Sequence, residues 1–168
     1  MNAMTHEHSF RTVRRSGGFT LVEMLMVTSI LTFLTILALP SLTAVVANNR
    51  LRAAGTDLMS SALLARSEAI KRNGRVQILP ASASDWTSGW RVQVVSTGEQ
   101  LDKRNTIGSQ VLVVGAPAAI VYEHTGRLTT PGSSQVQFQD PDRRPYAQSR
   151  CLVIDSSGLP KLSLGGCV

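Results

Sequence analysis

A run of 26 residues without a charged side chain, from Met24 to Asn49, constrains this chain more than any other feature. As an α-helix rising about 1.5 Å per residue, the run would reach about 39 Å, which exceeds the roughly 30 Å hydrocarbon layer of a membrane. We therefore expect a membrane-spanning helix over residues 19–47. A buried helix of a soluble protein is the alternative, but such helices seldom run this long without a charge.

Basic side chains flank this run unequally, with Arg11, Arg14 and Arg15 before it and Arg50 and Arg52 after it. The positive-inside tendency therefore keeps the N-terminus in the cytoplasm and places residues 48–168 on the other side of the membrane. A secretory signal would carry small residues after its apolar region, whereas Gly17 and Gly18 precede this one. We expect residues 1–18 to be a leader.

The helical pattern continues over residues 48–73 with an amphipathic character. One stripe is apolar and consists of Leu51, Leu58, Ala62, Ala65 and Ala69. The charged residues fall largely on the other faces, as in a helix that lies on a sheet. Asn73-Gly74 is a stop signal for the helix. Pro40 removes one backbone donor and is expected to kink or loosen the helix.

After Gly74 the apolar period changes to two, which predicts short strands. The runs are Arg75–Leu79, Trp90–Val95, Val111–Val114, Ala119–Glu123, Val136–Gln139, Cys151–Ile154 and Lys161–Leu164. The predicted fold class is α+β: a long N-terminal helix, half membrane-spanning and half amphipathic, packed on a small antiparallel β domain. Residues 48–168 form the globular domain, with helix 48–73 and β domain 74–168.

Cys151 and Cys167, the only two cysteines of the sequence, fall in the part expected outside the cytoplasm. A disulfide is the simple interpretation, and closing a loop of this length contributes about 3 kcal/mol in the loop-entropy model. Two alternatives have less support. Two cysteines without a nearby His do not make a zinc site, and their spacing is not that of a redox C-x-x-C pair.

The segment "GGFTLVEMLMVTSILTFLTILALP" resembles the class III signal of type IV pilins and type II secretion pseudopilins. The resemblance implies that a prepilin peptidase cuts between Gly18 and Phe19 and that the new amine of Phe19 is methylated. Glu23 is then the fifth residue after the cut, where that family carries a Glu. Pro40 matches a proline with which the family loosens its helix.

The physical role of Glu23 follows from its surroundings. An acid inside hydrocarbon costs a few kcal/mol and is usually functional. The new α-amine, positive at neutral pH, is unfavourable at a helix N-terminus. An amine on one helix and a Glu23 carboxylate on the next favour the axial offset that brings them together, so Glu23 would set the register of assembly. The alternative is an acid at headgroup level without a role.

Two further stretches, "ARSEAIKRN" and "WTSGW", resemble the FimT, FimU and GspH branch of minor pilins and pseudopilins. That resemblance implies a minor type IV pilin at or near the fibre tip, which helps to initiate assembly. It would begin in the inner membrane with a periplasmic domain and end in the extracellular fibre. Its partners would be prepilin peptidase and other pilins, bound through the N-terminal helix, with no cofactor, metal or small-molecule substrate. A type II secretion minor pseudopilin shares these features.

Simpler interpretations of the same residues also stand. Glu68 and Arg72 are spaced as an i,i+4 ion pair on a solvated helix face. Trp86 and Trp90 are better explained as packing residues than as a binding platform. The sequence shows no catalytic residues: it lacks G-x-S-x-G, a phosphate-binding glycine loop and H-E-x-x-H. Asp140 and Asp142, on either side of Pro141, are expected to face solvent.

DNA is a candidate partner, because the sequence pI is about 10.2. Basic residues of the C-terminal third could form a phosphate-binding patch: Arg127, Arg143, Arg144, Arg150 and Lys161. Without residues 1–18 the net charge is only about +4. Some FimT proteins are DNA receptors in natural transformation with a Gly-Arg-x-Arg motif. Here "GRLT" lacks the second arginine and "GLPK" lacks the first as well.

Overall fold

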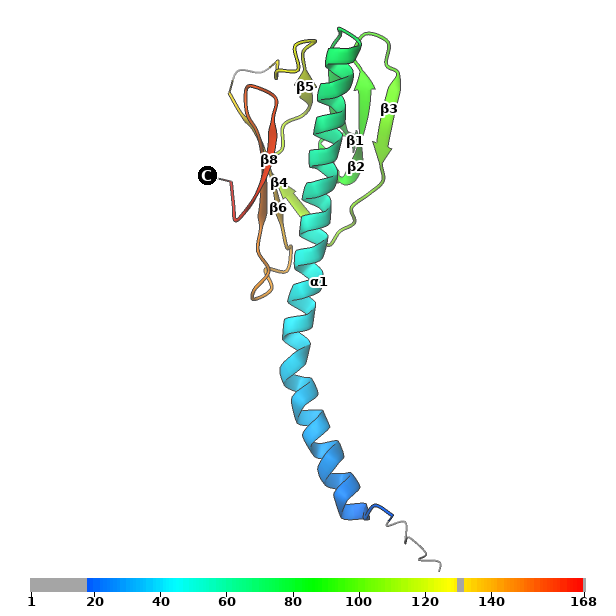
Figure 1. Ribbon diagram of the computed structural model, residues 1–168, viewed down its shortest axis with the longest axis vertical. Helices are drawn as coiled ribbons and strands as arrows, with labels where there is room; N and C mark the ends of the chain where they lie inside the picture. Colours follow the sequence, from blue (N-terminus) through cyan, green and yellow to red (C-terminus); the bar gives the residue numbers. More distant parts are fainter. Residues whose placement is uncertain (1–17, 130–131, 168) are drawn as a thin grey trace, which may run out of the picture. The chain divides into compact units, whose positions relative to one another are not determined.

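The computed structural model describes residues 18–129 and 132–167, except for the side chains of residues 37–41 (Figure 1). Contacts divide the chain into two units, Met1–Ala38 and Leu39–Val168. The second unit holds the β domain together with the second half of the long helix. This part confirms the predicted α+β class.

Helix α1 covers Leu21–Lys71 and contains 51 residues. It ends two residues before the predicted end, because Asn73 adopts a left-handed backbone with a φ of 49°. The N–H groups of Asn73 and Gly74 donate to the carbonyls of Ile70 and Ala69, at 3.2 and 3.1 Å. These two bonds form a Schellman motif, so the stop signal is confirmed and Asn73 is its left-handed residue.

In the part of the chain that the structure describes, no helix is both long enough and apolar enough to cross a membrane. The membrane span expected over residues 19–47 is therefore not confirmed. Pro40 falls within α1. Its side chain and the leader 1–17 lie outside the described residues, so the expected kink stays a prediction.

The β domain contains two four-stranded antiparallel sheets. The first has the order β3-β2-β1-β5, and the second has the order β4-β6-β7-β8. The strands are β1 Val76–Ser82, β2 Asp85–Val94, β3 Gln100–Arg104, β4 Leu112–Val114, β5 Ile120–Tyr122, β6 Ser134–Gln139, β7 Arg150–Ile154 and β8 Pro160–Leu164. In Figure 1 the second half of α1 runs along both sheets.

All seven predicted runs are strands, but the prediction missed β3 and the start of β2. Strand β3 carries Asp102, Lys103 and Arg104, and it lies at the edge of its sheet. Charged residues protect an open edge against pairing with another chain, and they also hide the apolar alternation that identifies a strand.

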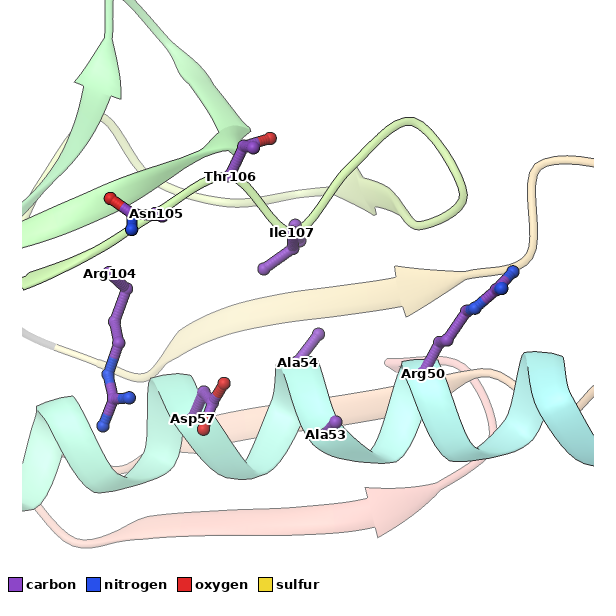
Figure 2. Close-up of a pocket in the computed structure, with 8 residues that line it drawn as sticks. All are labelled: Arg50, Ala53, Ala54, Asp57, Arg104, Asn105, Thr106 and Ile107. Carbon is purple, nitrogen blue, oxygen red and sulfur yellow. The ribbon is translucent and has the colours of Figure 1, made fainter.

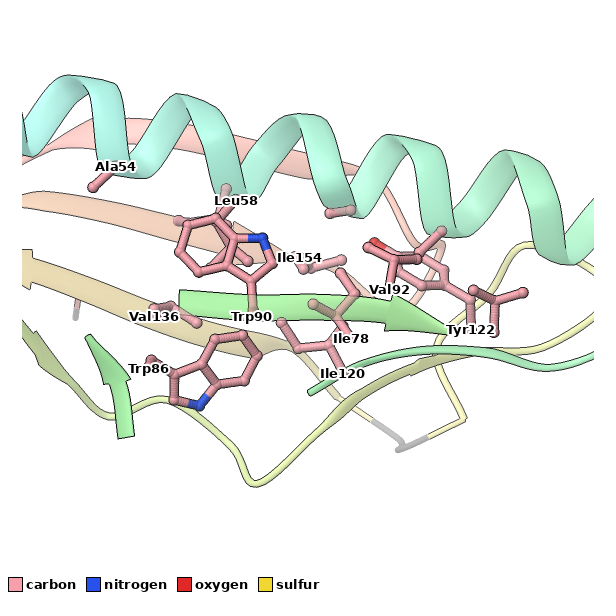
Figure 3. Close-up of a cluster of buried hydrophobic side chains, with 14 of the residues drawn as sticks. Ala54, Leu58, Ile78, Trp86, Trp90, Val92, Ile120, Tyr122, Val136 and Ile154 are labelled. Carbon is pink, nitrogen blue, oxygen red and sulfur yellow. The ribbon is translucent and has the colours of Figure 1, made fainter. Parts of the chain in front are cut away.

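The core lies between the apolar stripe of α1 and the two sheets (Figure 3). All five predicted stripe residues are buried. Gly55 also lies against the second sheet, since a Cβ there would approach Cδ1 of Leu162 to 2.8 Å. Small residues on the stripe thus let the sheet approach the helix closely.

Both tryptophans are packing residues, as predicted. The Trp90 indole N–H donates to the hydroxyl of Ser61 on α1 at 2.9 Å. The Trp86 indole N–H donates to the carbonyl of Pro117, also at 2.9 Å. Both rings are buried, and each has a partner for its polar atom, as a buried indole requires.

The predicted disulfide is present between Cys151 of β7 and Cys167, which follows β8, with a Cα–Cα distance of 5.1 Å. It fastens the end of the chain to the middle of the second sheet. The bond closes a loop that contains β7 from Cys151 onward and all of β8.

Replacing Cys151 by Ser should lower the free energy of unfolding by about 3 kcal/mol, because the unfolded chain regains the entropy of an open loop. Thermal denaturation of the oxidised protein measures the loss. Cys167→Ser is the matched control and should cost the same, while the double replacement should cost no more than either single one. An unchanged melting temperature would contradict this account.

Candidate functional site

The predicted processing junction lies just before α1. Gly18 is exposed, and a Cβ built there would meet no described atom within 4 Å. The side chain of Phe19 is 80% exposed. The backbone at this junction is therefore open to another protein, as a peptidase site requires.

Thr20 caps the start of α1. Its hydroxyl accepts the backbone N–H of Glu23 at 3.2 Å. A Thr followed three residues later by a Glu is the order of a capping box, and a carboxylate in the first turn is favoured by the helix dipole. Sequence reasoning missed this cap, although T-x-x-E was its signal. The Glu23 carboxylate thus also lies in the first turn of α1, where a negative charge stabilises the helix.

The first half of α1 presents apolar side chains that no described residue covers. Every residue from Leu21 to Ile36 is exposed. The hydroxyls of Thr28, Thr32 and Thr35 donate to carbonyls one turn back, at 2.9, 2.8 and 2.7 Å. These hydroxyls need no outside partner, so the surface suits burial in lipid or among other apolar helices.

The "ARSEAIKRN" stretch fastens the far end of α1 to the β domain. Arg66 Nε donates to the carbonyl of Gly126 at 3.1 Å. Arg72 forms the predicted ion pair with Glu68 at 2.7 Å. Both terminal nitrogens of Arg72 also donate to the carboxylate of Glu99, which follows β2. The hydrogen bond from Arg72 holds the pKa of Glu68 below its ordinary value. Sequence reasoning gave the pair but missed Glu99.

A surface pocket of about 320 Å³ lies between α1 and the segment after β3 (Figure 2). Its lining residues are Arg50, Ala53, Ala54, Asp57, Arg104, Asn105, Thr106 and Ile107. Arginine, carboxylate and amide groups on an open surface suit contact with another polar surface. Sequence reasoning did not identify this pocket.

The family described as "Type II transport protein GspH" matches residues 54–158, more than half of the chain. The chain belongs to this family. A second match, described as "Prokaryotic N-terminal methylation motif", covers residues 13–39 and so includes Gly18, Phe19 and Glu23. The two matches divide between the globular part and the N-terminal segment.

Two crystal structures of one minor pilin share the fold of this GspH-family chain. The Pseudomonas aeruginosa type IV minor pilin FimU is 21% identical in one crystal form, with a TM-score of 0.57 over 69% of this chain and 88% of that one. In a second crystal form, FimU is 22% identical, with a TM-score of 0.51 over 67% of this chain and 90% of that one. The Vibrio cholerae minor pseudopilin EpsH is 13% identical, with a TM-score of 0.48 over 68% of this chain and 95% of that one. No curated protein sequence matches the chain.

In this GspH-family protein the five basic residues of the candidate DNA site fall into two groups. One group is Arg127 and Lys161, and the other is Arg143, Arg144 and Arg150. Gly126 and Gly158 touch, since a Cβ at Gly158 would lie 2.0 Å from the Gly126 carbonyl oxygen. Arg127 and Lys161 follow these two glycines. Strand pairing places Lys161 opposite Val153 and Arg150 opposite Leu164, farther along the hairpin. Arg143 and Arg144 belong to the β6–β7 loop, on the Arg150 side.

Arg144 is already neutralised, which weakens the electrostatic argument for DNA. Its guanidinium donates to Asp140 at 2.7 Å and also pairs with Asp142. DNA binding stays a prediction that this arrangement does not favour. The expectation that Asp140 faces solvent is wrong, because Asp140 is only 6% exposed and also accepts the Arg144 backbone N–H. Asp142 is exposed, as expected.

Metal ligands do not gather in the described ranges, where no cluster of three or more His, Cys, Asp or Glu residues could hold an ion.

Proposed function

We propose that this chain is a minor type IV pilin, built into a fibre through the first half of α1. The observation that carries the proposal is the exposed apolar surface from Leu21 to Ile36, which has one acid, Glu23, in its first turn. The methylation motif over the same residues supports it, and so does the FimU-like fold of the globular part.

Before assembly, segment 19–47, whose one charged residue is Glu23, holds the subunit in the inner membrane, and residues 48–168 face the periplasm. Internally bonded hydroxyls of Thr28, Thr32 and Thr35 make the helix surface compatible with lipid. Prepilin peptidase removes residues 1–18 and exposes the amine of Phe19. The chain then exchanges lipid for other pilin helices and enters the extracellular fibre.

The Glu23 carboxylate gives this exchange its specificity. Apolar helices slide past one another at little cost, because lipid and Leu side chains are equally apolar. An amine on one helix and a carboxylate on its neighbour remove that freedom, because each is costly to bury without the other. The subunit's work is therefore structural and requires no cofactor. A place near the fibre tip and a role in starting assembly belong to the same proposal.

A type II secretion pseudopilin is the second candidate, and the GspH family match favours it specifically. The two functions share the leader, the helix and the fold. Deleting the gene distinguishes them: loss of twitching motility supports the pilin, whereas loss of protein secretion with normal twitching supports the pseudopilin. Crosslinking in sheared fibres then identifies the partner subunits.

Processing at Gly18 gives a direct test of the leader. Gly18→Leu should leave the leader attached, because a bulky side chain prevents the close approach of the peptidase to the backbone. The uncleaved chain would run more slowly on a denaturing gel. Gly18→Ala is the matched control and need not stop cleavage. A Leu variant of mature size would contradict the assigned cut.

A further inference from the structure

The β6–β7 loop, residues 140–149, is fastened to α1 by one amide side chain. Asn48 Nδ2 donates to the carbonyl of Tyr146 at 3.0 Å, and Asn48 Oδ1 accepts the N–H of Gln148 at 2.8 Å. Asn48 thus binds the loop backbone as a strand neighbour would. The Asp140–Arg144 ion pair closes the other side of the loop. The loop is therefore held in one conformation.

That conformation carries backbone strain. Arg143 and Tyr146 have φ values of 48° and 68°, a left-handed region that costs a non-glycine residue about 1–2 kcal/mol. Such strain persists only where the surroundings impose it, and it gathers at functional sites. Here the strained loop projects two side chains outward: Tyr146 is 81% exposed, and Arg143 is also exposed.

Beside the loop lies an amphiphilic pocket of about 320 Å³, lined by Leu42, Thr43, Val46, Arg50, Gln110 and Arg144. Leu42 and Val46 supply exposed apolar side chains of α1, and the arginines supply charge. Figure 2 shows Arg50 extending from α1 toward the end of β6, where the loop begins. An occupant needs an apolar part and an anionic part.

Two arginines have charge available for a ligand: Arg50 in the lining of this pocket, and Arg143 in the β6–β7 loop that supplies Arg144 to the lining. Arg144 is engaged by Asp140 and Asp142. For Arg50 and Arg143, no ion pair is found within the residues that the structure describes. Both are exposed, and Arg50 is the first charged residue after the uncharged run that ends at Asn49.

We infer that this pocket and the loop's Arg143 and Tyr146 bind the headgroup region of an anionic phospholipid at the surface of the membrane. The inference rests on the proposed function, which places α1 in that membrane. Arginine binds phosphate oxygens in a bidentate manner, and a tyrosine ring prefers the boundary between lipid and water. Leu42 and Val46 then meet the upper acyl chain. This contact with lipid is lost when the subunit leaves the membrane and enters the fibre.

The full-length protein in nanodiscs, of phosphatidylcholine alone or mixed with phosphatidylglycerol, provides the test. A spin label at Pro145→Cys keeps Tyr146 in place, and the native cysteines are held in their disulfide. Collisions with oxygen report lipid, and collisions with a water-soluble nickel chelate report solvent. With phosphatidylglycerol present, the label at residue 145 should collide mainly with oxygen. A label at exposed Lys161→Cys should collide mainly with the nickel chelate.

Charge variants sharpen the result. Arg50→Gln or Arg143→Gln should weaken lipid contact at residue 145 about fivefold, the worth of one basic residue at an anionic surface. Arg127→Gln, in the other basic group, should change nothing. A second label at Leu31→Cys separates the two proposals. Lipid contact at residue 31 with water contact at 145, or with shielding of 145 from both reagents, overturns this inference alone. Water contact at residue 31 overturns the membrane anchoring as well.

Discussion

Replacing Glu23 by Ala is expected to leave cleavage intact and to reduce incorporation into fibres at least a hundredfold. Loss of one partner from a buried ion pair costs about 3–5 kcal/mol, because the remaining amine of Phe19 is buried without a mate. The first turn of α1 also loses a favourable carboxylate, a smaller effect. Quantifying the variant in sheared fibres, relative to the membrane pool, measures the reduction.

Two variants separate register from helix capping. Glu23→Gln keeps a side chain suited to the capping box and removes the charge, so it should be as defective as Ala. Thr20→Ala removes the hydroxyl that accepts the Glu23 N–H and keeps the charge, so it should cost about 1 kcal/mol of helix stability and only modestly reduce incorporation. Normal incorporation of Glu23→Ala would refute the register role.

Trp90→Ala should give the largest loss of stability, about 3–5 kcal/mol. The indole is 1% exposed and is packed between α1 and the first sheet, so its removal leaves a cavity (Figure 3). The hydroxyl of Ser61 also loses its indole donor inside the core. Chemical denaturation of the oxidised protein measures the change in unfolding free energy.

Trp90→Phe is the matched control, because it keeps an aromatic ring and removes the N–H. Its cost should be smaller, about 1–3 kcal/mol, from the unpaired Ser61 hydroxyl and the lost ring volume. If Trp90→Ala cost less than about 1 kcal/mol, the ring would not be part of the core, and a binding platform would have to be reconsidered.

The sequence predicted the helix and its buried stripe because both depend on local periodicity. Leu51, Leu58 and the alanines of the stripe recur at helical spacing, and this spacing alone fixes the face they share. The Cys151–Cys167 bond could also be anticipated, since the sequence offers a single pairing.

Features that depend on residues distant in sequence were not predictable. Strand β3 is stabilised by its pairing with β2 and carries little apolar alternation of its own. The burial of Asp140 depends on the loop folding back so that Arg144 covers it. The separation of Lys161 from Arg150 depends on strand register. The Thr20 cap differs, because its T-x-x-E signal was local and available.

Mass spectrometry of the N-terminal peptide, taken from chains in sheared surface fibres, tests the central claim most directly. A minor pilin of this kind should yield a peptide that begins at Phe19 with one methyl group on its amine and lacks residues 1–18. A fibre-bound chain that still begins at Met1 or Met4 would contradict the account, because the amine that Glu23 is proposed to pair with would not exist.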